Sequence, residues 1–339
     1  MGRTRTMNHK IAVIGAGGWG TALAVMWQRA EKDVTLWTAF EEESAEIKQF
    51  RENKRYLPGV LIPENLTVTS DAESALDGSE IVVFVVPSKY LGKVAKQLKE
   101  FIPTKARIIS ATKGLAEETI PPLRMTQVLQ NNLCVVPERI VALSGPSHAE
   151  EVGRGLPTTI VMAGKNIEEL REFLSTEIFR IYTSDDVIGV ELGGTLKNPI
   201  AIAAGIGKGL GAGDNALGAL VTRGIAEVTR LGVAAGAREK TFAGLSGIGD
   251  LVTTCISEHS RNRRVGIELA KGRKISDILS SLGMVAEGVE TARSASKWAE
   301  SLGVETPIIS AVKSVIFDNK SPKEELQKLM TRTLKHEFE

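Results

Sequence analysis

The sequence predicts an α/β protein, with an N-terminal Rossmann-type domain that has a mostly parallel, doubly wound sheet, followed by an all-α C-terminal domain. Three observations support this prediction. Short apolar segments alternate with helical patterns through the first half, a glycine-rich turn follows the first of these segments, and beyond residue 189 apolar residues recur at helical spacing. A chain of 339 residues suits two domains, which we expect at residues 8–188 and 189–335.

The predicted strands of the first half are short and rich in valine and isoleucine. Several are continuously apolar, which is typical of strands buried on both faces of a sheet. Helical patterns at residues 21–29, 41–50 and 91–101 separate them, and this alternation indicates parallel strands. The strands are expected at residues 10–15, 33–37, 66–69, 81–86, 107–111, 140–144 and 158–163.

Glycine and proline interrupt the predicted helical domain. Seven glycines lie between Gly193 and Gly213, although each glycine inside a helix costs about 1 kcal/mol relative to alanine. We therefore expect helices or a ligand to approach the backbone closely there. Pro199 disfavours helical geometry at Asn198, so a helix is expected to break or restart at this point. The helices are expected at residues 200–210, 215–231, 264–271, 276–282, 290–302 and 307–317, with a solvated last helix after Asn319.

The composition argues against several classes of protein. A formal net charge of +1 gives no reason to expect nucleic acid or an anionic membrane as a partner. The two cysteines, Cys134 and Cys255, are far apart, which suits a reducing cytoplasm and argues against disulfides and a metal site. The polar N-terminal segment lacks the apolar core of a signal peptide, and no apolar stretch is long enough for membrane insertion. We expect a soluble cytoplasmic protein.

A glycine-rich turn, Gly15-Ala16-Gly17-Gly18-Trp19-Gly20, joins the first predicted strand to the first predicted helix. Such glycines form a tight turn, let the backbone approach a pyrophosphate and let the helix contact the strand, while the helix N-terminus attracts the anion. The alternative is a glycine turn without a ligand. The strand before the motif and the helix after it favour a dinucleotide site.

The end of the second predicted strand does not specify NAD over NADP. An NAD site usually has Asp or Glu there, to bind the ribose 2′-hydroxyl. Here the strand ends at Trp37 and is followed by Thr38-Ala39-Phe40, with acids only from Glu41 onward. These acids are expected to begin the next helix, where carboxylates in the first turn are favourable.

Two polar turns follow buried strands of the predicted sheet. They are Thr112-Lys113-Gly114 and Gly145-Pro146-Ser147-His148-Ala149. Because ligands bind beyond the carboxyl ends of parallel strands, Lys113 is a candidate for a phosphate or carbonyl oxygen. The alternative is a solvated lysine in a turn.

The predicted helical domain adds a second lysine. Lys197 and Asn198 precede Pro199 within apolar sequence. Burial disfavours the charged form of lysine and lowers its pKa toward the range useful for proton transfer, whereas the alternative is a lysine whose stem is buried and whose amine reaches solvent. None of the four histidines has an obvious carboxylate partner in the sequence. Lysine is therefore the better candidate for the proton.

Three arginines in four residues follow Ser260, at positions 261, 263 and 264. Guanidinium groups pair with phosphate in a bidentate manner, so this segment is a candidate anion site. A solvated helix start explains the same residues equally well.

In their order along the chain, these elements resemble the bacterial-type NAD(P)-dependent glycerol-3-phosphate dehydrogenases. The resemblance covers about residues 15 to 317, and its motifs are specific when taken together. They are GAGGWGTALA (15–24), NKRYLPG (53–59), ATKGL (111–115), LSGPSHAEEV (143–152), ELGGTLKN (191–198), GAGDNALGALVTRGIAE (211–227), GLSGIGDLVTTC (244–255), SRNRR (260–264) and VAEGVET (285–291).

The resemblance implies a homodimer that transfers a hydride between NADPH or NADH and C2 of dihydroxyacetone phosphate, giving sn-glycerol 3-phosphate for phospholipid synthesis. It makes Lys197 the catalytic proton donor and acceptor. The substrate site would comprise Lys113, Gly145, Ser147, Lys197, Asn198, Asp250, Thr254, Ser260, Arg261 and Asn262. The cofactor site would comprise Gly15, Gly17, Gly18, Trp19, Gly20, Lys113, Ala149, Arg261, Val285 and Glu287.

Two positions depart from the pattern of the family. Gly18 stands where serine is commoner, and His148 stands where phenylalanine is usual. We expect His148 to be a packing substitution rather than a base. The alternatives to this function are a related two-domain hydroxy-acid dehydrogenase, which would not require a phosphate on its substrate, and a non-catalytic NAD(P)-binding regulator.

Overall fold

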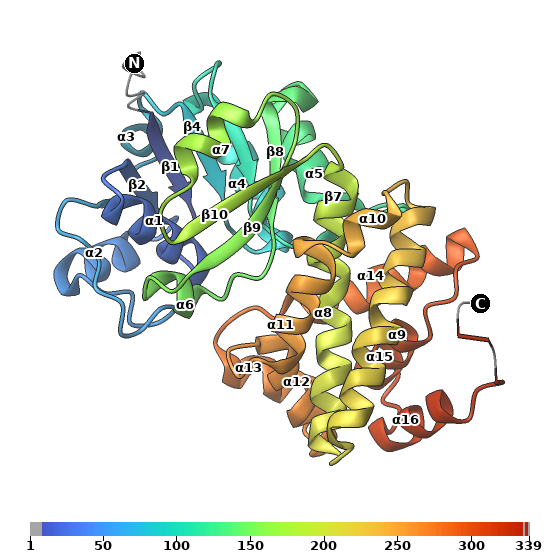
Figure 1. Cartoon of the computed structure of the whole chain (residues 1–339). Coiled ribbons are helices and arrows are strands. Elements are labelled where there is room, and N and C mark those ends of the chain that lie inside the picture. Colours follow the sequence, from blue (N-terminus) through green and yellow to red (C-terminus); the bar gives the residue numbers. More distant parts are fainter. Residues whose placement is uncertain (1–8, 335, 338–339) are drawn as a thin grey trace. The chain divides into compact units, whose positions relative to one another are not determined.

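The computed structural model describes residues 9–334, 336 and 337. The chain separates into two compact units. The first comprises the residues up to Ala116 together with Leu123–Glu191, and the second comprises Glu117–Pro122 and the residues from Leu192 onward. The outer limits expected from the sequence, residues 8 and 335, lie outside the described residues. Figure 1 shows the sheet of the first unit and the helices of the second.

The first unit contains an eight-stranded sheet in the order β10-β9-β8-β5-β4-β1-β2-β3. Neighbouring strands are parallel except at β8 and β9. The order β3-β2-β1-β4-β5-β8 within it is that of a dinucleotide-binding fold, and it confirms the predicted mostly parallel sheet. The strands are β1 (Lys10–Ile14), β2 (Asp33–Trp37), β3 (Thr67–Thr69), β4 (Ile81–Phe84), β5 (Arg107–Ser110), β8 (Ile140–Ser144), β9 (Thr158–Ala163) and β10 (Phe179–Ser184).

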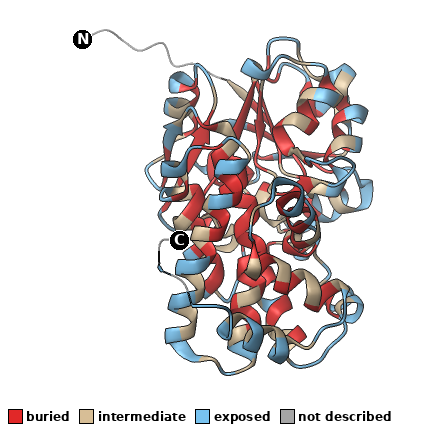
Figure 2. Ribbon diagram, turned by 90° about the vertical axis from the view of Figure 1, so that its right-hand side faces the viewer, coloured by how far each residue is buried: buried red, intermediate tan, exposed pale blue. Residues whose placement is uncertain are grey.

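Alternate residues of the central strands enter two separate apolar cores. Ile11 and Val13 of β1 face a core shared with α1 and α7. Ala12 and Ile14 face a core shared with α3, α4 and α5. Burial on both faces, seen as red strands in Figure 2, explains why these strands have continuous apolar sequences. The helices are α1 (Gly18–Arg29), α2 (Glu41–Phe50), α3 (Ala72–Leu76), α4 (Ser88–Leu98), η1 (Lys99–Phe101), α5 (Met125–Leu133), η2 (Pro137–Arg139), α6 (Ala149–Gly153) and α7 (Glu168–Leu174).

Three strands were not predicted from the sequence. β10 lies at the edge of the sheet, and its residues alternate between buried and exposed. It therefore lacks the continuous apolar run by which the central strands were recognised. The other two, β6 (Leu115–Ala116) and β7 (Leu123–Arg124), form a separate antiparallel pair of two residues each, which is too short for a sequence pattern.

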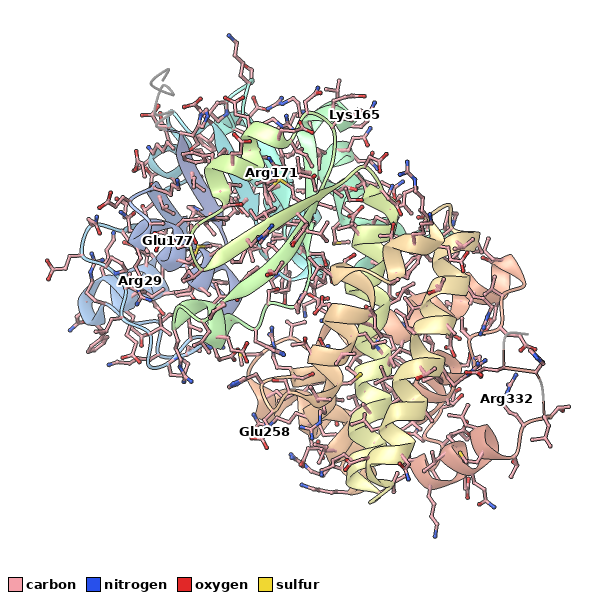
Figure 3. All side chains as sticks on the ribbon, in the orientation of Figure 1. Arg29, Lys165, Arg171, Glu177, Glu258 and Arg332 are labelled. Atoms are coloured by element: carbon pink, nitrogen blue, oxygen red, sulfur yellow. The ribbon has the colours of Figure 1, made fainter. Side chains whose placement is uncertain are left out.

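Among its described residues, the second unit contains helices joined by turns and no strands, as predicted. Charged side chains on its surface project outward, as Glu258 and Arg332 do in Figure 3. The helices are α8 (Val187–Gly209), which begins in the first unit, α9 (Gly213–Ala234), α10 (Glu239–Phe242), η3 (Leu245–Gly249), α11 (Asp250–Ile256), α12 (Arg261–Ala270), α13 (Ile275–Leu282), α14 (Glu287–Leu302), α15 (Pro307–Phe317) and α16 (Pro322–Met330).

The expected helix break at Asn198 was wrong, because α8 continues through Pro199. Proline cannot donate to the carbonyl of Thr195, and this loss normally interrupts a helix. Here the residues on both sides are held by packing, since Leu196 and Ile200 are completely buried. Tertiary burial outweighs the local preference that the sequence analysis relied on.

Two glycines of α8 lie where the backbone of another helix approaches too closely for any side chain. A Cβ atom on Gly193 would lie 2.6 Å from the carbonyl oxygen of Ser246 in η3, and one on Gly205 would lie 2.0 Å from that of Arg263 in α12. Both distances are shorter than a van der Waals contact. The predicted close approach of backbones is therefore confirmed, and it brings η3 and α12 against α8.

A buried carboxylate joins two helices of the second unit. Glu227 of α9 is 1% exposed, and it accepts the backbone N–H groups of Ile308 (2.9 Å) and Ile309 (2.8 Å) at the start of α15. Burial raises the pKa of Glu227 from 4.5 to about 7, although the two N–H groups, Arg230 and Arg332 act in the opposite direction. The folded chain thus binds this proton more tightly than the unfolded chain does.

We expect this proton to make the stability of the protein depend on pH. Because the folded state holds more protons between pH 4.5 and 7, the free energy of unfolding should fall as pH rises through this range and then level off. The contribution of Glu227 is at most about 3 kcal/mol. Urea unfolding at pH 5 and pH 8 measures it, and Glu227→Gln should remove it, whereas the exposed control Glu239→Gln should not. An unchanged pH dependence in Glu227→Gln would contradict this assignment.

Candidate active site

The glycine-rich turn lies between β1 and α1 in the first unit. Gly15 has φ = +116°, and a Cβ atom on Gly20 would lie 1.9 Å from the Gly15 carbonyl oxygen, so the turn requires both glycines. At Gly17, the N-cap of α1, a Cβ atom would meet nothing within 4 Å, and the first turn of the helix contains no acidic residue. Open space beside an uncapped helix N-terminus fits the pyrophosphate of a dinucleotide.

The end of β2 differs from the expectation in one respect. Glu41, Glu42 and Glu43 begin α2, as predicted. However, the hydroxyl of Thr38 donates a hydrogen bond to the Glu43 carboxylate. The sequence analysis assigned these acids only to the start of the next helix, and the structure adds that the first turn of this helix brings Glu43 back to Thr38.

Asn53 holds a neighbouring segment against the glycine-rich turn. Its amide nitrogen donates to the carbonyl oxygen of Ala16 (2.7 Å) and to the hydroxyl of Thr21 (2.8 Å), and its oxygen accepts the N–H of Tyr56 (3.1 Å). Asn53 is 2% exposed. Sequence analysis gave it no role, although the NKRYLPG motif contained it, because nothing local indicates a contact with a turn that is more than 30 residues away.

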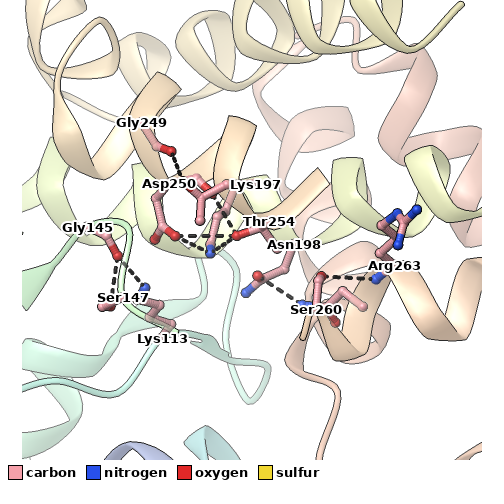
Figure 4. Close-up of polar contacts among 12 residues, drawn as sticks. Lys113, Gly145, Ser147, Lys197, Asn198, Gly249, Asp250, Thr254, Ser260 and Arg263 are labelled. Carbon is pink, nitrogen blue, oxygen red and sulfur yellow. Dashed lines mark hydrogen bonds and ion pairs between the residues drawn. The ribbon is translucent and has the colours of Figure 1, made fainter. Parts of the chain in front are cut away.

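The polar turns after β5 and β8 meet at the Gly145 carbonyl. Lys113 donates to this oxygen from 3.1 Å, and the hydroxyl of Ser147 donates to it from 2.9 Å (Figure 4). Because β5 and β8 are neighbours in the sheet, Lys113 reaches across from one strand end to the next. Lys113 is thus a partly buried, positioned lysine rather than a fully solvated one.

Lys197 is buried in the second unit beside a carboxylate and a hydroxyl. Its ammonium nitrogen lies 2.5 Å from Oδ1 of Asp250 and 2.5 Å from the hydroxyl of Thr254. The Thr254 hydroxyl in turn donates to the Asp250 carbonyl oxygen (2.6 Å). The side chains of Lys197 and Asp250 are 7% and 3% exposed. Figure 4 shows Lys197 directed toward both partners.

The backbone of η3 and α11 positions these partners. η3 is a turn of π-helix, a form that often occurs at functional sites, and it packs against Gly193 one turn before Lys197. Asp250 is the first residue of α11, and Thr254 lies one turn later. The next residue, Cys255, is completely buried, and burial raises the pKa of its thiol to about 12.

A chain of hydrogen bonds links α8, α12 and α14. The amide of Asn262 donates to the side-chain oxygen of Asn198 (3.0 Å) and accepts the N–H of Gly288 (3.0 Å). Arg261, which is exposed, donates to the carbonyl of Val285 (3.0 Å). Ser260 caps α12 by accepting the N–H of Arg263 (3.2 Å). The segment is therefore a helix start, and its first residues are tied to the segment before α14.

The candidate residues fall into one group in each unit. The first unit holds Gly15, Gly17, Gly18, Trp19, Gly20, Lys113, Gly145, Ser147 and Ala149. The second holds Lys197, Asn198, Asp250, Thr254, Ser260, Arg261, Asn262, Val285 and Glu287. Of the departures from the family pattern, Gly18 begins α1 and His148 is the N-cap of α6.

Across residues 9–334, 336 and 337, no three His, Cys, Asp or Glu side chains gather in a way that would hold a metal ion. In the same residues, no helix is both long enough and apolar enough to cross a bilayer.

Two family models match nearly the whole chain. The model for the N-terminus of the NAD-dependent glycerol-3-phosphate dehydrogenases matches residues 10–170, and the model for their C-terminus matches residues 186–327. The chain belongs to this family. The sequence resemblance to the NAD-dependent glycerol-3-phosphate dehydrogenases is thereby confirmed.

Individual members of the glycerol-3-phosphate dehydrogenase family match over nearly their full length. The enzyme named glycerol-3-phosphate dehydrogenase (NAD(P)+) of Pelotomaculum thermopropionicum is 46% identical over 337 residues, which cover 98% of this chain and 96% of the relative. That of Citrifermentans bemidjiense is 47% identical, covering 98% and 99%. The crystal structure of the Coxiella burnetii glycerol-3-phosphate dehydrogenase superimposes with a TM-score of 0.91 at 38% identity, covering 96% and 99%.

Proposed function

We propose that this protein interconverts dihydroxyacetone phosphate and sn-glycerol 3-phosphate with NADPH or NADH, and that Lys197 is its catalytic acid and base. The observation that carries the assignment of Lys197 is its buried contact with Asp250 and Thr254. Removing a lysine and a carboxylate from water costs free energy that their mutual attraction often does not recover. A catalytic role therefore explains this buried pair better than a contribution to stability does. When bound, the dinucleotide supplies the hydride that reduces C2.

Lys197 protonates the oxygen that develops negative charge on C2. Its ammonium has three N–H donors, and Asp250 and Thr254 each accept one in the present arrangement. Burial disfavours the ammonium and the Asp250 carboxylate favours it. The pair thus keeps a proton available at a buried position, while Thr254, fixed by the Asp250 carbonyl, orients the amine.

The phosphate of the substrate is bound by the start of α12. Ser260 and Asn262 are buried there, and Arg261 is exposed. A guanidinium group and a helix N-terminus both favour a phosphate. The resemblance to the family assigns Lys113, Gly145 and Ser147 of the first unit to substrate binding. It assigns Asn198 to the support of Lys197.

The glycine-rich turn from Gly15 to Gly20 binds the pyrophosphate of the cofactor. By the same resemblance, Lys113, Ala149, Arg261, Val285 and Glu287 complete this site. The family also suggests a cytoplasmic homodimer that supplies phospholipid synthesis. The predicted domains at residues 8–188 and 189–335 would then bind the nucleotide and the substrate, respectively.

One assay tests this function and the choice of cofactor. We expect oxidation of both NADPH and NADH with dihydroxyacetone phosphate, and little with unphosphorylated dihydroxyacetone. The preference for NADPH should not exceed about 100-fold in kcat/KM at fixed ionic strength, or about 2.7 kcal/mol. Equal activity on both ketones would favour a hydroxy-acid dehydrogenase, and dinucleotide binding without turnover would favour a regulator. A preference for NADH above about tenfold would contradict the predicted cofactor use.

A further inference from the structure

A carboxylate, Glu43, lies at the carboxyl end of β2, and the positive charge of Arg55 acts on it. In folds of this type the adenosine ribose of a dinucleotide is bound there, with a carboxylate for the 2′-hydroxyl of NADH or an arginine for the 2′-phosphate of NADPH. We infer that Glu43 and Arg55 together set the choice of cofactor, Glu43 by accepting the ribose hydroxyl and Arg55 by pairing with the 2′-phosphate. This inference rests on the proposed function, because it requires a dinucleotide on the glycine-rich turn.

Glu43 is the carboxylate that the strand itself lacks. Thr38, the first residue after β2, is 2% exposed, and its hydroxyl donates to Glu43. Glu41 and Glu42 in the same turn are exposed, whereas Glu43 is half-buried. Burial raises the pKa of Glu43, with opposing effects from Thr38 and Arg55. A partly desolvated carboxylate gains more from accepting a ribose hydroxyl than an exposed one does.

Arg55 belongs to the segment that Asn53 holds against the glycine-rich turn. The Tyr56 carbonyl lies so close to the glycine-rich turn that a Cβ atom on Gly18 would be 2.6 Å from its oxygen. Arg55 is exposed, its guanidinium carbon lies 4.9 Å from the centre of the Tyr56 ring, and its charge acts on Glu43. The segment that lies against the glycine-rich turn thus carries an exposed cation whose charge acts on Glu43.

The neighbouring charges do not share this arrangement. Both cations contact an aromatic ring, the ammonium of Lys54 lying 3.2 Å from the centre of the Phe50 ring in α2. Arg55 is the one whose charge acts on Glu43. Glu42 is exposed in the same helical turn as Glu43. These two residues therefore offer matched controls for Arg55 and Glu43.

Opposite charges at one position predict a weak preference between the cofactors. Glu43 repels a 2′-phosphate and Arg55 attracts it, so the two effects offset each other for NADPH. For NADH, Glu43 provides an acceptor, and Arg55 has no phosphate to pair with. Removing Arg55 should therefore shift the preference toward NADH, and removing Glu43 should shift it toward NADPH.

Direct binding of NADPH and NADH, measured by the fluorescence of the reduced nicotinamide at fixed ionic strength, tests this inference. Hydrogen bonds to a charged group correspond to changes of about 10- to 100-fold in Kd. We expect Arg55→Gln to raise Kd for NADPH by this factor and to leave NADH within about threefold. We expect Glu43→Gln to raise Kd for NADH by about tenfold without weakening NADPH. Lys54→Gln and Glu42→Gln should change neither.

Equal weakening of both nucleotides by Arg55→Gln would overturn the inference, since the arginine would then serve a part of the cofactor that both share. An unchanged Kd for NADH in Glu43→Gln would also overturn it. If the unaltered protein bound neither nucleotide, the proposed function itself would fail and the inference with it. That outcome is distinct from variants that bind normally with unchanged preference.

Discussion

Replacing Lys197 with alanine is expected to lower turnover by about two to four orders of magnitude, the usual contribution of a positioned acid or base. The affinity for the dinucleotide should change little, because the glycine-rich turn belongs to the first unit. Steady-state kinetics with dihydroxyacetone phosphate and direct titration of NADPH measure the two effects separately. The matched control is Lys208→Ala, an exposed lysine of the same helix, which should retain full turnover.

Loss of Lys197 also leaves the buried Asp250 carboxylate without its ion-pair partner, which can cost about 3–5 kcal/mol of stability. If the alanine variant does not fold, Lys197→Arg provides a second test. An arginine retains the positive charge beside Asp250 but cannot release its proton near neutral pH, so this variant should fold and remain inactive. More than a third of wild-type turnover in either folded variant would show that Lys197 is not the proton donor.

Arg261→Ala is expected to have the second largest effect, on KM for dihydroxyacetone phosphate. Removing one partner of a charge pair costs about 2 kcal/mol or more, which corresponds to a rise in KM of about 30-fold or more. The remaining KM should depend less on salt, because a charge contact to the phosphate is lost. Initial rates over a range of substrate and salt concentrations measure both changes. Arg264→Ala, an exposed arginine of the same helix, is the control.

Arg261 also donates to the carbonyl of Val285, so its loss could loosen the segment before α14. Measuring KM for NADPH in the same variant separates this effect from phosphate binding. An equal loss of kcat/KM on dihydroxyacetone phosphate and on unphosphorylated dihydroxyacetone would show that Arg261 does not bind the phosphate.

The parts of the fold that the sequence predicted were those with a strong local pattern. Central strands such as β1 and β4 are buried on both faces, and their continuous apolar residues identified them. The edge strand β10 alternates between buried and exposed residues and was missed. At Pro199 a strong local pattern gave a wrong prediction. The preference of proline for a helix break was outweighed by the burial of Leu196 and Ile200.

The candidate site was predictable as a set of residues but not as an arrangement. Lys197, Asp250 and Thr254 were each chosen from motifs. Their contact joins positions 53 and 57 residues apart, which no local pattern encodes. Asn53 was missed for the same reason, since its amide reaches a turn more than 30 residues away. Glu43 contacts a residue only five positions earlier, and it was missed because the acids after the strand were assigned only to the start of a helix.

The burial of Cys255 has a practical consequence. Alkylating reagents attack the thiolate, and a thiol with a pKa of about 12 and no exposed surface supplies almost none at neutral pH. The chain's other cysteine, Cys134, is exposed in the first unit, at the end of α5. A maleimide dye should therefore react with Cys134 in the native protein and leave Cys255, next to Thr254, unmodified. The natural sequence already provides a handle for fluorescence measurements, without any cysteine having to be added or removed.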